Sequence, residues 1–388
     1  MPTAPLTVEQ FGLGDRRIRE FALLPWKLYR GDPCWTPPLN MDLLGNRLLG
    51  AKGLLTAEHP YHQSAEVTHF LARRGGRAVG RVSASINHRF NDYHGTRLGS
   101  FGFFEVENDY EAAAALLDAA RGWIVSRDMT AMRGPGEYSN ATHERQGVLV
   151  EGFEFPPTVE LTHNPPYYGE FLERYGLAKV KDYVAYMIDF DDVPRERIER
   201  AAAAVAKRAR IVTRCADMSR FAEELRLVIR LYNEAWADNW GFLPQTDEEA
   251  DALAESLKPI IDPNLVRFAY IDDEPVAVFG GIPDPNWALR PRWKWYGDSD
   301  PVRLARLLPV RHHIPRVRVM FFGIRPAYRR IGVDAVLFKE LYDYAAKHGY
   351  RQGEPSLLLE DNFMVIRASV AMGGRHYKTW RIYEMPVA

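Results

Sequence analysis

The stretch GIRPAYRRIGVDAVL, residues 323–337, joins a run of apolar residues to an apolar helical pattern. A loop that only connects two elements can be almost any polar sequence. A loop that binds an anion needs exposed backbone N–H groups, a residue without a Cβ and nearby positive charge. Gly332 would permit close approach, and Arg325, Arg329 and Arg330 supply the charge. The stretch therefore predicts a phosphate-binding turn between a strand and a helix; the alternative is a helix start with surface arginines.

The same order of elements occurs twice along the chain. Each half contains a hairpin pattern, a third apolar strand, a helix and a short strand. They lie at 67–87, 98–107, 110–127 and 129–134, and again at 266–282, 316–324, 329–348 and 355–360. The repeat predicts an α/β (α+β) protein with two similar domains, each a mixed central sheet flanked by helices. We place the boundary near an Ala- and Arg-rich helix, which gives domains 1–190 and 191–388.

Length and charge agree with this division. The chain has 388 residues and a net charge of −1. Such a length favours more than one core. A near-neutral molecule has no overall field that attracts nucleic acid, so we expect no nucleic-acid partner. The sequence does not indicate an oligomeric state.

The two cysteines and the pattern of the N-terminus bear on the compartment. Cys34 and Cys215 are far apart, which argues against a disulfide framework and a cysteine-built metal site. The histidines have no second ligand at useful spacing, so we expect no metal. Neither a signal-peptide pattern nor a long apolar run is present. We therefore expect a cytoplasmic protein.

The spacing Pro326, Tyr328, Arg329, Gly332 resembles the acyl-CoA pyrophosphate loop of the GNAT (Gcn5-related N-acetyltransferase) superfamily, whose usual form is Arg/Gln-x-x-Gly-x-Gly/Ala. Asp334 departs from it at the last position. A carboxylate there suits the helix dipole but repels a phosphate unless it faces outward.

The corresponding turn of the first half, FFEVENDYEAAAA at 103–115, has no glycine. It carries four carboxylates, Glu105, Glu107, Asp109 and Glu111. These would oppose a pyrophosphate. We therefore predict that only the C-terminal half holds CoA.

Further stretches widen the resemblance. NWGFLPQTDEE (239–249), IPDPN (282–286), GPGEYSN (134–140) and HNPPYY (163–168) are similar to segments of the bacterial ceramide synthase-like family, which are tandem-GNAT proteins of about this length. The resemblance covers essentially the whole chain. It implies acyl transfer from acetyl-CoA or a longer acyl-CoA to an amine, which is a small molecule or a lipid long-chain base. A carrier-protein donor stays open, and the alternative is a catalytically inactive GNAT-fold protein that binds acyl-CoA or acts as a scaffold.

The resemblance also implies which residues contact the cofactor. The loop would contribute Ile324, Arg325, Arg329, Arg330, Ile331, Gly332, Val333 and Asp334. Asn362 occupies the place of an asparagine that can meet the pantetheine arm. Its other interpretation is a helix N-cap, and the two roles are compatible.

Amine acylation needs a base for the nucleophile, a donor for the oxyanion and an acid for the thiolate. The third strand of the second half, RVRVMFFGI, has no acidic residue. The nearest carboxylates, at the ends of strands that should line the central cleft, are Asp284, Glu360 and Asp361, and we prefer Glu360 as the base. Tyr377 and Tyr383 are candidates for the acid or for the acyl pocket. Turn positions for the carboxylates and core positions for the tyrosines are the structural alternatives.

Candidate acceptor residues come from two segments. Trp240 and Phe242 interrupt a helical pattern and could wall an apolar pocket; ordinary packing at a helix end is the alternative. His163, followed by Asn164, is either a substrate contact or a structural histidine. Residues 287–318 mix Trp, Tyr and cations in a way that suits peripheral membrane contact. The same mixture could clamp CoA phosphates or pack over the cleft.

Overall fold

The computed structural model describes residues 4–138, 145–206, 210–258, 260–291 and 299–387. The chain forms two compact units. The N-terminal unit comprises Met1–Tyr183, Leu289–Ala305 and Lys378–Ala388, and the C-terminal unit comprises Val184–Ala288 and Arg306–Tyr377. This division differs from the expected one because the last strand pairs with strands of the first half, so residues 378–388 belong to the N-terminal unit.

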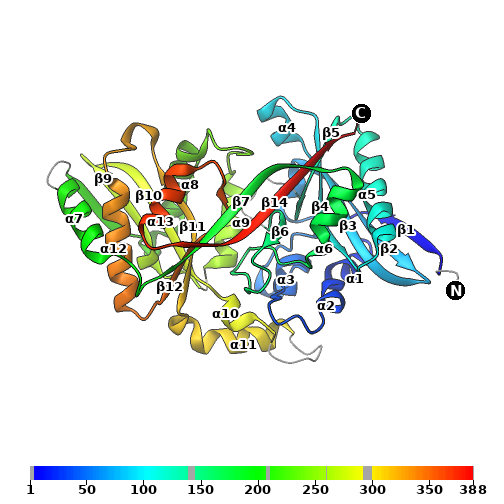
Figure 1. The fold of residues 1–388 in the computed structure, drawn as a ribbon, viewed down its shortest axis with the longest axis horizontal. Helices are drawn as coiled ribbons and strands as arrows, with labels where there is room; N and C mark the ends of the chain where they lie inside the picture. Colours follow the sequence, from blue (N-terminus) through cyan, green and yellow to red (C-terminus); the bar gives the residue numbers. More distant parts are fainter. Residues whose placement is uncertain (1–3, 139–144, 207–209, 259, 292–298, 388) are drawn as a thin grey trace. The chain divides into compact units, whose positions relative to one another are not determined.

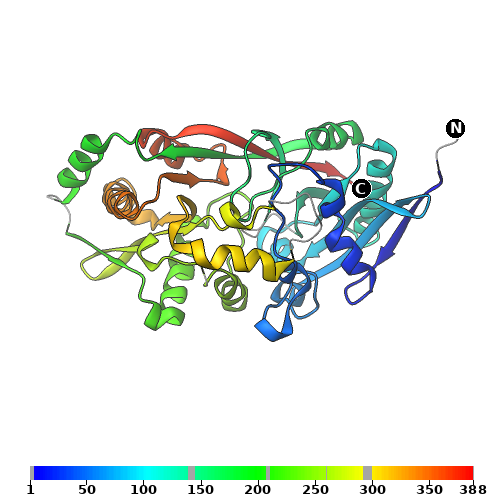
Figure 2. The same ribbon diagram turned by 90° about the horizontal axis from the view of Figure 1, so that it is seen from below.

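The N-terminal unit contains a mixed sheet with the strand order β1-β2-β3-β4-β5-β14. The strands are β1 (Leu6–Phe11), β2 (Ala65–Arg74), β3 (Arg77–Asn87), β4 (Leu98–Val106), β5 (Ala131–Gly136) and β14 (Arg375–Pro386). Helices α5 (Tyr110–Val125) and α6 (Tyr167–Tyr175) cover one face, and α1 (Arg17–Leu23) and α2 (Pro25–Leu28) lie on the other (Figures 1 and 2). Neighbouring residues of β2 alternate between the two cores: Phe70 packs with the α5 side and Leu71 with the α1 side.

The C-terminal unit contains a mixed sheet with the order β7-β12-β11-β10-β9-β8. Its strands are β7 (Ala178–Asp189), β8 (Ile211–Cys215), β9 (Val266–Ile271), β10 (Glu274–Pro283), β11 (Arg316–Ile324) and β12 (Gln352–Pro355). Helix α12 (Val333–Lys347) places Val333 and Leu337 on one face, and α8 (Phe221–Trp236) places Leu231 on the other (Figure 2). Both faces are buried, as the apolar runs at 275–283 in β10 and 319–324 in β11 require.

The remaining elements connect and cover these sheets. They are α3 (Asn40–Leu44), α4 (His88–His94), β6 (Val148–Glu151), α7 (Arg195–Ala206), α9 (Asp247–Leu257), α10 (Asn286–Leu289), α11 (Asp300–Val310), β13 (Leu358–Leu359) and α13 (Phe363–Ala371). Across the described residues, no helix combines the length and the apolar character that a membrane crossing needs.

The predicted repeat is confirmed, because the two units share one feature that positions a site. In the N-terminal unit, β4 pairs in parallel with β5 from Leu98 to Gly102, and β4 then continues without it to Val106. In the C-terminal unit, β11 pairs in parallel with β12 from Arg316 to Val319 and continues to Ile324. In each unit, therefore, the parallel neighbour pairs with only the first half of the long strand. The second half extends beyond that neighbour and leads into a helix.

Part of the basic segment 287–318 is not at the surface. Residues 292–298, with Trp293, Trp295 and Tyr296, lie outside the described residues. Arg303 and Arg318 are 0% and 2% exposed. Arg303 donates to the carbonyl oxygens of Pro37 and Pro38, and Arg318 donates to Ser356 Oγ at 3.1 Å. The expectation that these two arginines face a membrane is therefore wrong; they satisfy buried acceptors instead.

Candidate functional site

The loop that precedes α12 has the backbone that the sequence predicts. Gly332 is the N-cap of α12 with φ of +95°, and no side chain caps the helix. Within the described residues, no acceptor is recorded for the N–H groups of Ile331, Gly332 and Val333. Unpaired N–H groups at a helix start, with the dipole behind them, attract anions.

The three arginines of this loop differ in their contacts. Arg325 forms ion pairs with Glu234, at 2.6 Å, and with Glu274. Arg329 donates to the carbonyl oxygen of Ala235 at 2.7 Å. Arg330 is exposed, and no partner for its side chain is recorded among the described residues. Arg325 and Arg329 thus hold the loop in place, whereas Arg330 is the cation available to a ligand.

Gly332 also has a packing role. A Cβ at this position would lie 2.4 Å from Cγ2 of Val205 on α7, and the positive φ disfavours any other residue. Asp334 lies half-buried in the first turn of α12. The glycine is therefore required by the fold as well as by any approaching phosphate.

A buried polar cluster lies at the other end of β11. Asp284 follows β10 and is 2% exposed, and Glu354 on β12 is 0% exposed. Burial, and then the carboxylate of Glu354, raise the pKa of Tyr377 well above its usual value, with a smaller contribution from Asp284. Two of the predicted catalytic residues therefore lie in one neighbourhood. Glu354 was missed because the expected strand began at residue 355.

The other candidates of the C-terminal unit differ in burial and in their contacts. Glu360 is half-buried after β13. Asn362 is the N-cap of α13, and its side chain accepts from the N–H of Val365 at 3.5 Å. Phe242 is buried against Tyr232, with ring centroids 5.8 Å apart. Trp240 is half-buried in the turn after α8.

Tyr383 does not join Tyr377. It lies in the N-terminal unit, is 0% exposed and donates to Glu173 at 3.0 Å. Burial, then the bond to Glu173, raise its pKa. Tyr377 belongs to the C-terminal unit and Tyr383 to the N-terminal unit, so β14 places two tyrosines that are close in sequence in different units.

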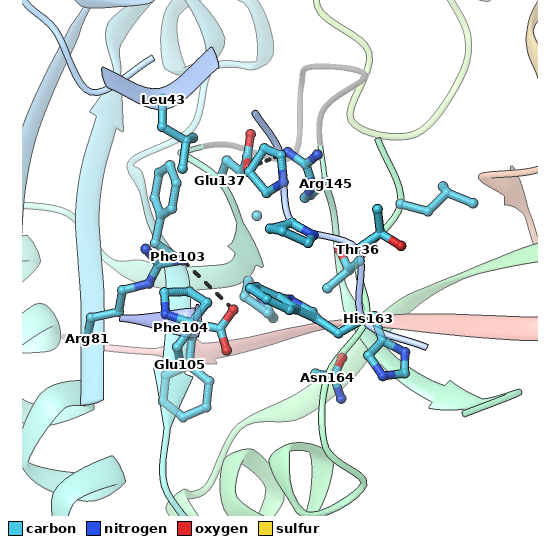
Figure 3. Close-up of a pocket in the computed structure, with 18 of the residues that line it drawn as sticks. Thr36, Leu43, Arg81, Phe103, Phe104, Glu105, Glu137, Arg145, His163 and Asn164 are labelled. Atoms are coloured by element: carbon cyan, nitrogen blue, oxygen red, sulfur yellow. Dashed lines mark hydrogen bonds and ion pairs between the residues drawn. The ribbon is translucent and has the colours of Figure 1, made fainter. Parts of the chain in front are cut away.

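The N-terminal unit contains a cavity of about 90 Å³ where β4 runs on beyond the end of β5 (Figure 3). Figure 3 shows Arg81 and Glu105 on one side and Thr36, His163 and Asn164 on the other. Trp26, Trp35, Phe103 and Phe104 supply aromatic lining. The sequence indicated His163 and Asn164 but not their neighbours, because the lining comes from segments that are far apart in the chain.

Two hydroxyl groups hold the Glu105 carboxylate. Tyr29 and Tyr168 donate to its Oε2 at 2.7 and 2.9 Å. Its Oε1 lies 3.8 Å from Nη2 of Arg81, beyond hydrogen-bond distance. Burial raises the pKa of Glu105, and the charge of Arg81 partly offsets this. From the sequence, Glu105 was predicted only to repel a phosphate through its charge.

The two predicted substrate contacts have different environments. His163 is 8% exposed, and its Nε2 lies 2.9 Å from Oδ2 of Asp32. Asn164 accepts from the N–H of Leu149 at 2.7 Å and donates to the carbonyl oxygens of Leu149 and Pro165. Asn164 thus fastens the segment after β6, while the second ring nitrogen of His163 has no recorded partner.

Among the described residues, no group of three or more His, Cys, Asp or Glu side chains is arranged to hold a metal ion. Two largely buried arginines have side-chain partners: Arg318 donates to the neutral Ser356 hydroxyl at 3.1 Å, and Arg145 forms an ion pair with Glu137 at 2.9 Å.

The chain contains two strand–helix–strand units, and in each the long strand extends beyond the end of its parallel partner. This arrangement defines the chain as a tandem protein of the GNAT fold. The tandem GNAT protein from the clavulanic acid biosynthesis pathway matches 99% of both chains with a TM-score of 0.55 at 14% identity. A GCN5-related N-acetyltransferase from Sphaerobacter thermophilus matches with a TM-score of 0.54 at 14% identity, over 99% of this chain and 97% of that one. These likenesses establish the fold.

Sequence comparison then gives the family. No family model matches the chain. The bacterial ceramide synthase of Caulobacter vibrioides is 34% identical over 379 residues, which are 95% of this chain and 94% of the relative. Protein YghO of Escherichia coli K12 is 30% identical over 97% of this chain and 94% of the relative. The chain belongs to the tandem-GNAT bacterial ceramide synthase-like family, and its family relationship supports an N-acyltransferase activity.

Proposed function

We propose that the protein is an acyl-CoA-dependent N-acyltransferase whose thioester substrate binds in the C-terminal unit. The start of α12 would hold the diphosphate of acetyl-CoA or a longer acyl-CoA, and an amine would accept the acyl group. One relative is named a bacterial ceramide synthase, so we propose a lipid long-chain base as the acceptor.

The observation that carries this proposal is the uncapped start of α12. Three consecutive N–H groups, a glycine with φ of +95° and an exposed arginine occur together at the end of β11. A diphosphate would supply the acceptors that the helix start lacks. Asn362, at the start of α13, is proposed to contact the pantetheine arm.

The reaction forms a C–N bond and breaks the C–S bond of the thioester. The amine loses one proton, and the thiolate gains one. We propose Glu360 as the base, with Asp284 as the second candidate. Tyr377 is the candidate acid, since its raised pKa keeps the hydroxyl protonated at neutral pH and able to donate.

Charge reversal at Arg330 tests the binding loop. Arg330 is exposed and has no recorded structural partner, so Arg330→Glu should weaken CoA binding ~10-fold to 100-fold and leave the fold intact. Arg351→Glu is the matched control, because Arg351 is also an exposed arginine of the same unit but follows the far end of α12. Isothermal titration with CoA measures both variants. Equal affinities would exclude the loop as the diphosphate site.

Thiol release tests the activity. Acetyl-CoA and palmitoyl-CoA are each mixed with hexylamine or sphinganine, and the free thiol of CoA is measured. Amine-dependent release with formation of the amide supports the proposal. CoA binding without release for any of these pairs would favour the inactive acyl-CoA-binding protein.

A further inference from the structure

We propose that the cavity of the N-terminal unit binds an organic ammonium ion with an apolar body. The cavity lies where β4 outruns β5, and its central charged group is the Glu105 carboxylate. Oε2 is occupied by two tyrosine hydroxyls, and no hydrogen bond to Oε1 is recorded among the described residues. An ammonium group is a three-fold donor without acceptors, which suits an anionic oxygen of this kind.

The charge around the cavity favours a cation. Among the described residues, the cavity lining holds two carboxyl groups and two guanidinium groups, and three further carboxyl groups interact with this set. The acids are Asp32, Asp42, Glu105, Glu137 and Glu160, and the cations are Arg81 and Arg145. Burial raises the pKa of Glu105 and Glu137, and it raises that of Asp42 to about 7. Each shift reflects negative charge that is costly to keep, and an entering cation would offset that cost.

Three buried polar atoms of the lining have no hydrogen-bond partner within the part of the chain that the structure describes. They are Thr36 Oγ1, Arg81 Nε and His163 Nδ1, on side chains that are 6%, 5% and 8% exposed. Buried polar atoms are usually satisfied. Thr36 Oγ1 and His163 Nδ1 can each accept from an ammonium group, whereas Arg81 Nε is a donor that such a group does not satisfy. A carboxylate guest could pair with Arg81, but it would also meet Glu105 and Glu137.

The remaining lining suits the apolar body of such a ligand. The edge of Trp26 meets Trp35, with centroids 5.1 Å apart, and Tyr29 stacks on Trp35 at 5.0 Å. Aromatic faces attract organic cations as well as apolar chains.

The segment that carries Trp35 and Thr36 is held firmly. Arg303 donates to Pro38 O at 2.7 Å, and Asp300 accepts from the N–H groups of Asn40 and Met41, both at 2.8 Å. The site is therefore built into the fold of this unit, and α11 is part of its support.

Binding of three six-carbon probes to the full chain tests the proposal. Hexylamine, hexan-1-ol and hexanoate have similar apolar bodies and differ in charge. We expect hexylammonium to bind at pH 7.5 at least ~10-fold more tightly than the other two by isothermal titration calorimetry. Equal binding of the three, preference for hexanoate, or no binding of hexylamine would overturn the proposal, and this comparison needs no variant.

A matched pair of variants locates the site. Glu105→Gln keeps the shape and the tyrosine partners but removes the charge, so hexylammonium affinity should fall at least ~10-fold. Glu107→Gln removes a carboxylate two residues away that pairs with Arg77 outside the cavity, and it should leave the affinity unchanged. If Glu105→Gln binds as tightly as the parent, the cavity is not the site. If it melts as an unfolded chain, Trp35→Leu, which removes an aromatic wall, takes its place with the same expected loss.

These titrations contain no thioester, so they do not depend on the proposed acyl transfer. Failure of CoA to bind would contradict the diphosphate site and would not affect the proposal of an ammonium site. Failure of hexylamine to bind would contradict the ammonium site and would not affect the proposal of a diphosphate site.

Discussion

The turn after β4 and the turn after β11 occupy the same place in the two units, but they differ in whether a side chain caps the helix that follows. Asp109 caps α5 by accepting from the N–H of Ala112 at 3.2 Å, and Arg74 pairs with Asp109 at 2.7 Å. Gly332 begins α12 with no side-chain cap. The N-terminal unit thus satisfies N–H groups of its helix start with a side chain, whereas at the start of α12 no side-chain cap is found within the described residues.

The long strands differ in a complementary way. β4 carries Glu105 beside a cavity, whereas β11 has no acidic residue. The C-terminal unit has exposed positive charge at the turn after its long strand, and the N-terminal unit has a buried carboxylate on its long strand. The two proposals therefore assign an anion to the C-terminal unit and a cation to the N-terminal unit, although the long strands of the two units have the same geometry.

Giving α12 the cap of α5 should have the largest effect. Gly332→Asp would place a carboxylate and a Cβ where a phosphate has to approach, so we expect CoA affinity to fall more than ~100-fold. Isothermal titration with CoA measures the loss, and thermal unfolding measures the accompanying strain from φ of +95° and from Val205. Val205→Ala in the same background relieves the clash and should restore the melting temperature in part but not the affinity. Recovery of both would mean that packing alone explains the loss.

Removal of the proposed base should reduce turnover without a change in CoA binding. Glu360→Gln is expected to lower kcat ~100-fold, and Asp284→Asn serves as the comparison. Both are measured by thiol release with saturating acyl-CoA. If only Asp284→Asn loses turnover, the base belongs to the buried cluster with Tyr377; if neither does, the proton leaves by another route.

The sequence predicted the features that local patterns determine. The repeat of hairpin, strand and helix was visible from apolar periodicity, and Gly332 was visible because few other residues adopt its φ. The cavity was not predicted, because Arg81, Glu105 and His163 meet only after three distant segments pack together. Charge pairing is also a tertiary property: Arg303 and Arg318 were expected at the surface, and both satisfy buried acceptors.

Removing the cap of α5 should affect stability and not CoA affinity. Asp109→Ala deletes the N-cap and the partner of Arg74, which should lower the free energy of unfolding by about 1–2 kcal/mol. Burial opposes ionisation, but hydrogen bonds from Arg74 lower the pKa of Asp109 below its usual value. The difference between parent and variant is therefore fully present above the unfolded pKa and is lost as pH falls through the folded one. Denaturant titrations at pH 7 and pH 3 measure it; a CoA affinity that changes in parallel would contradict the assignment of CoA to the other unit.

The smallest effect concerns Glu105, whose pKa is raised by burial despite Arg81 on β3, Tyr29 after α2, Tyr168 on α6 and the nearby His163. In the window between the ordinary glutamate value and the raised one, the folded chain holds a proton that the unfolded chain releases. The stability of the parent relative to Glu105→Gln should therefore fall as pH rises through that window. Hexylammonium should flatten this decline, because it stabilises the ionised carboxylate. A steeper decline in its presence would mean that no cation enters beside Glu105.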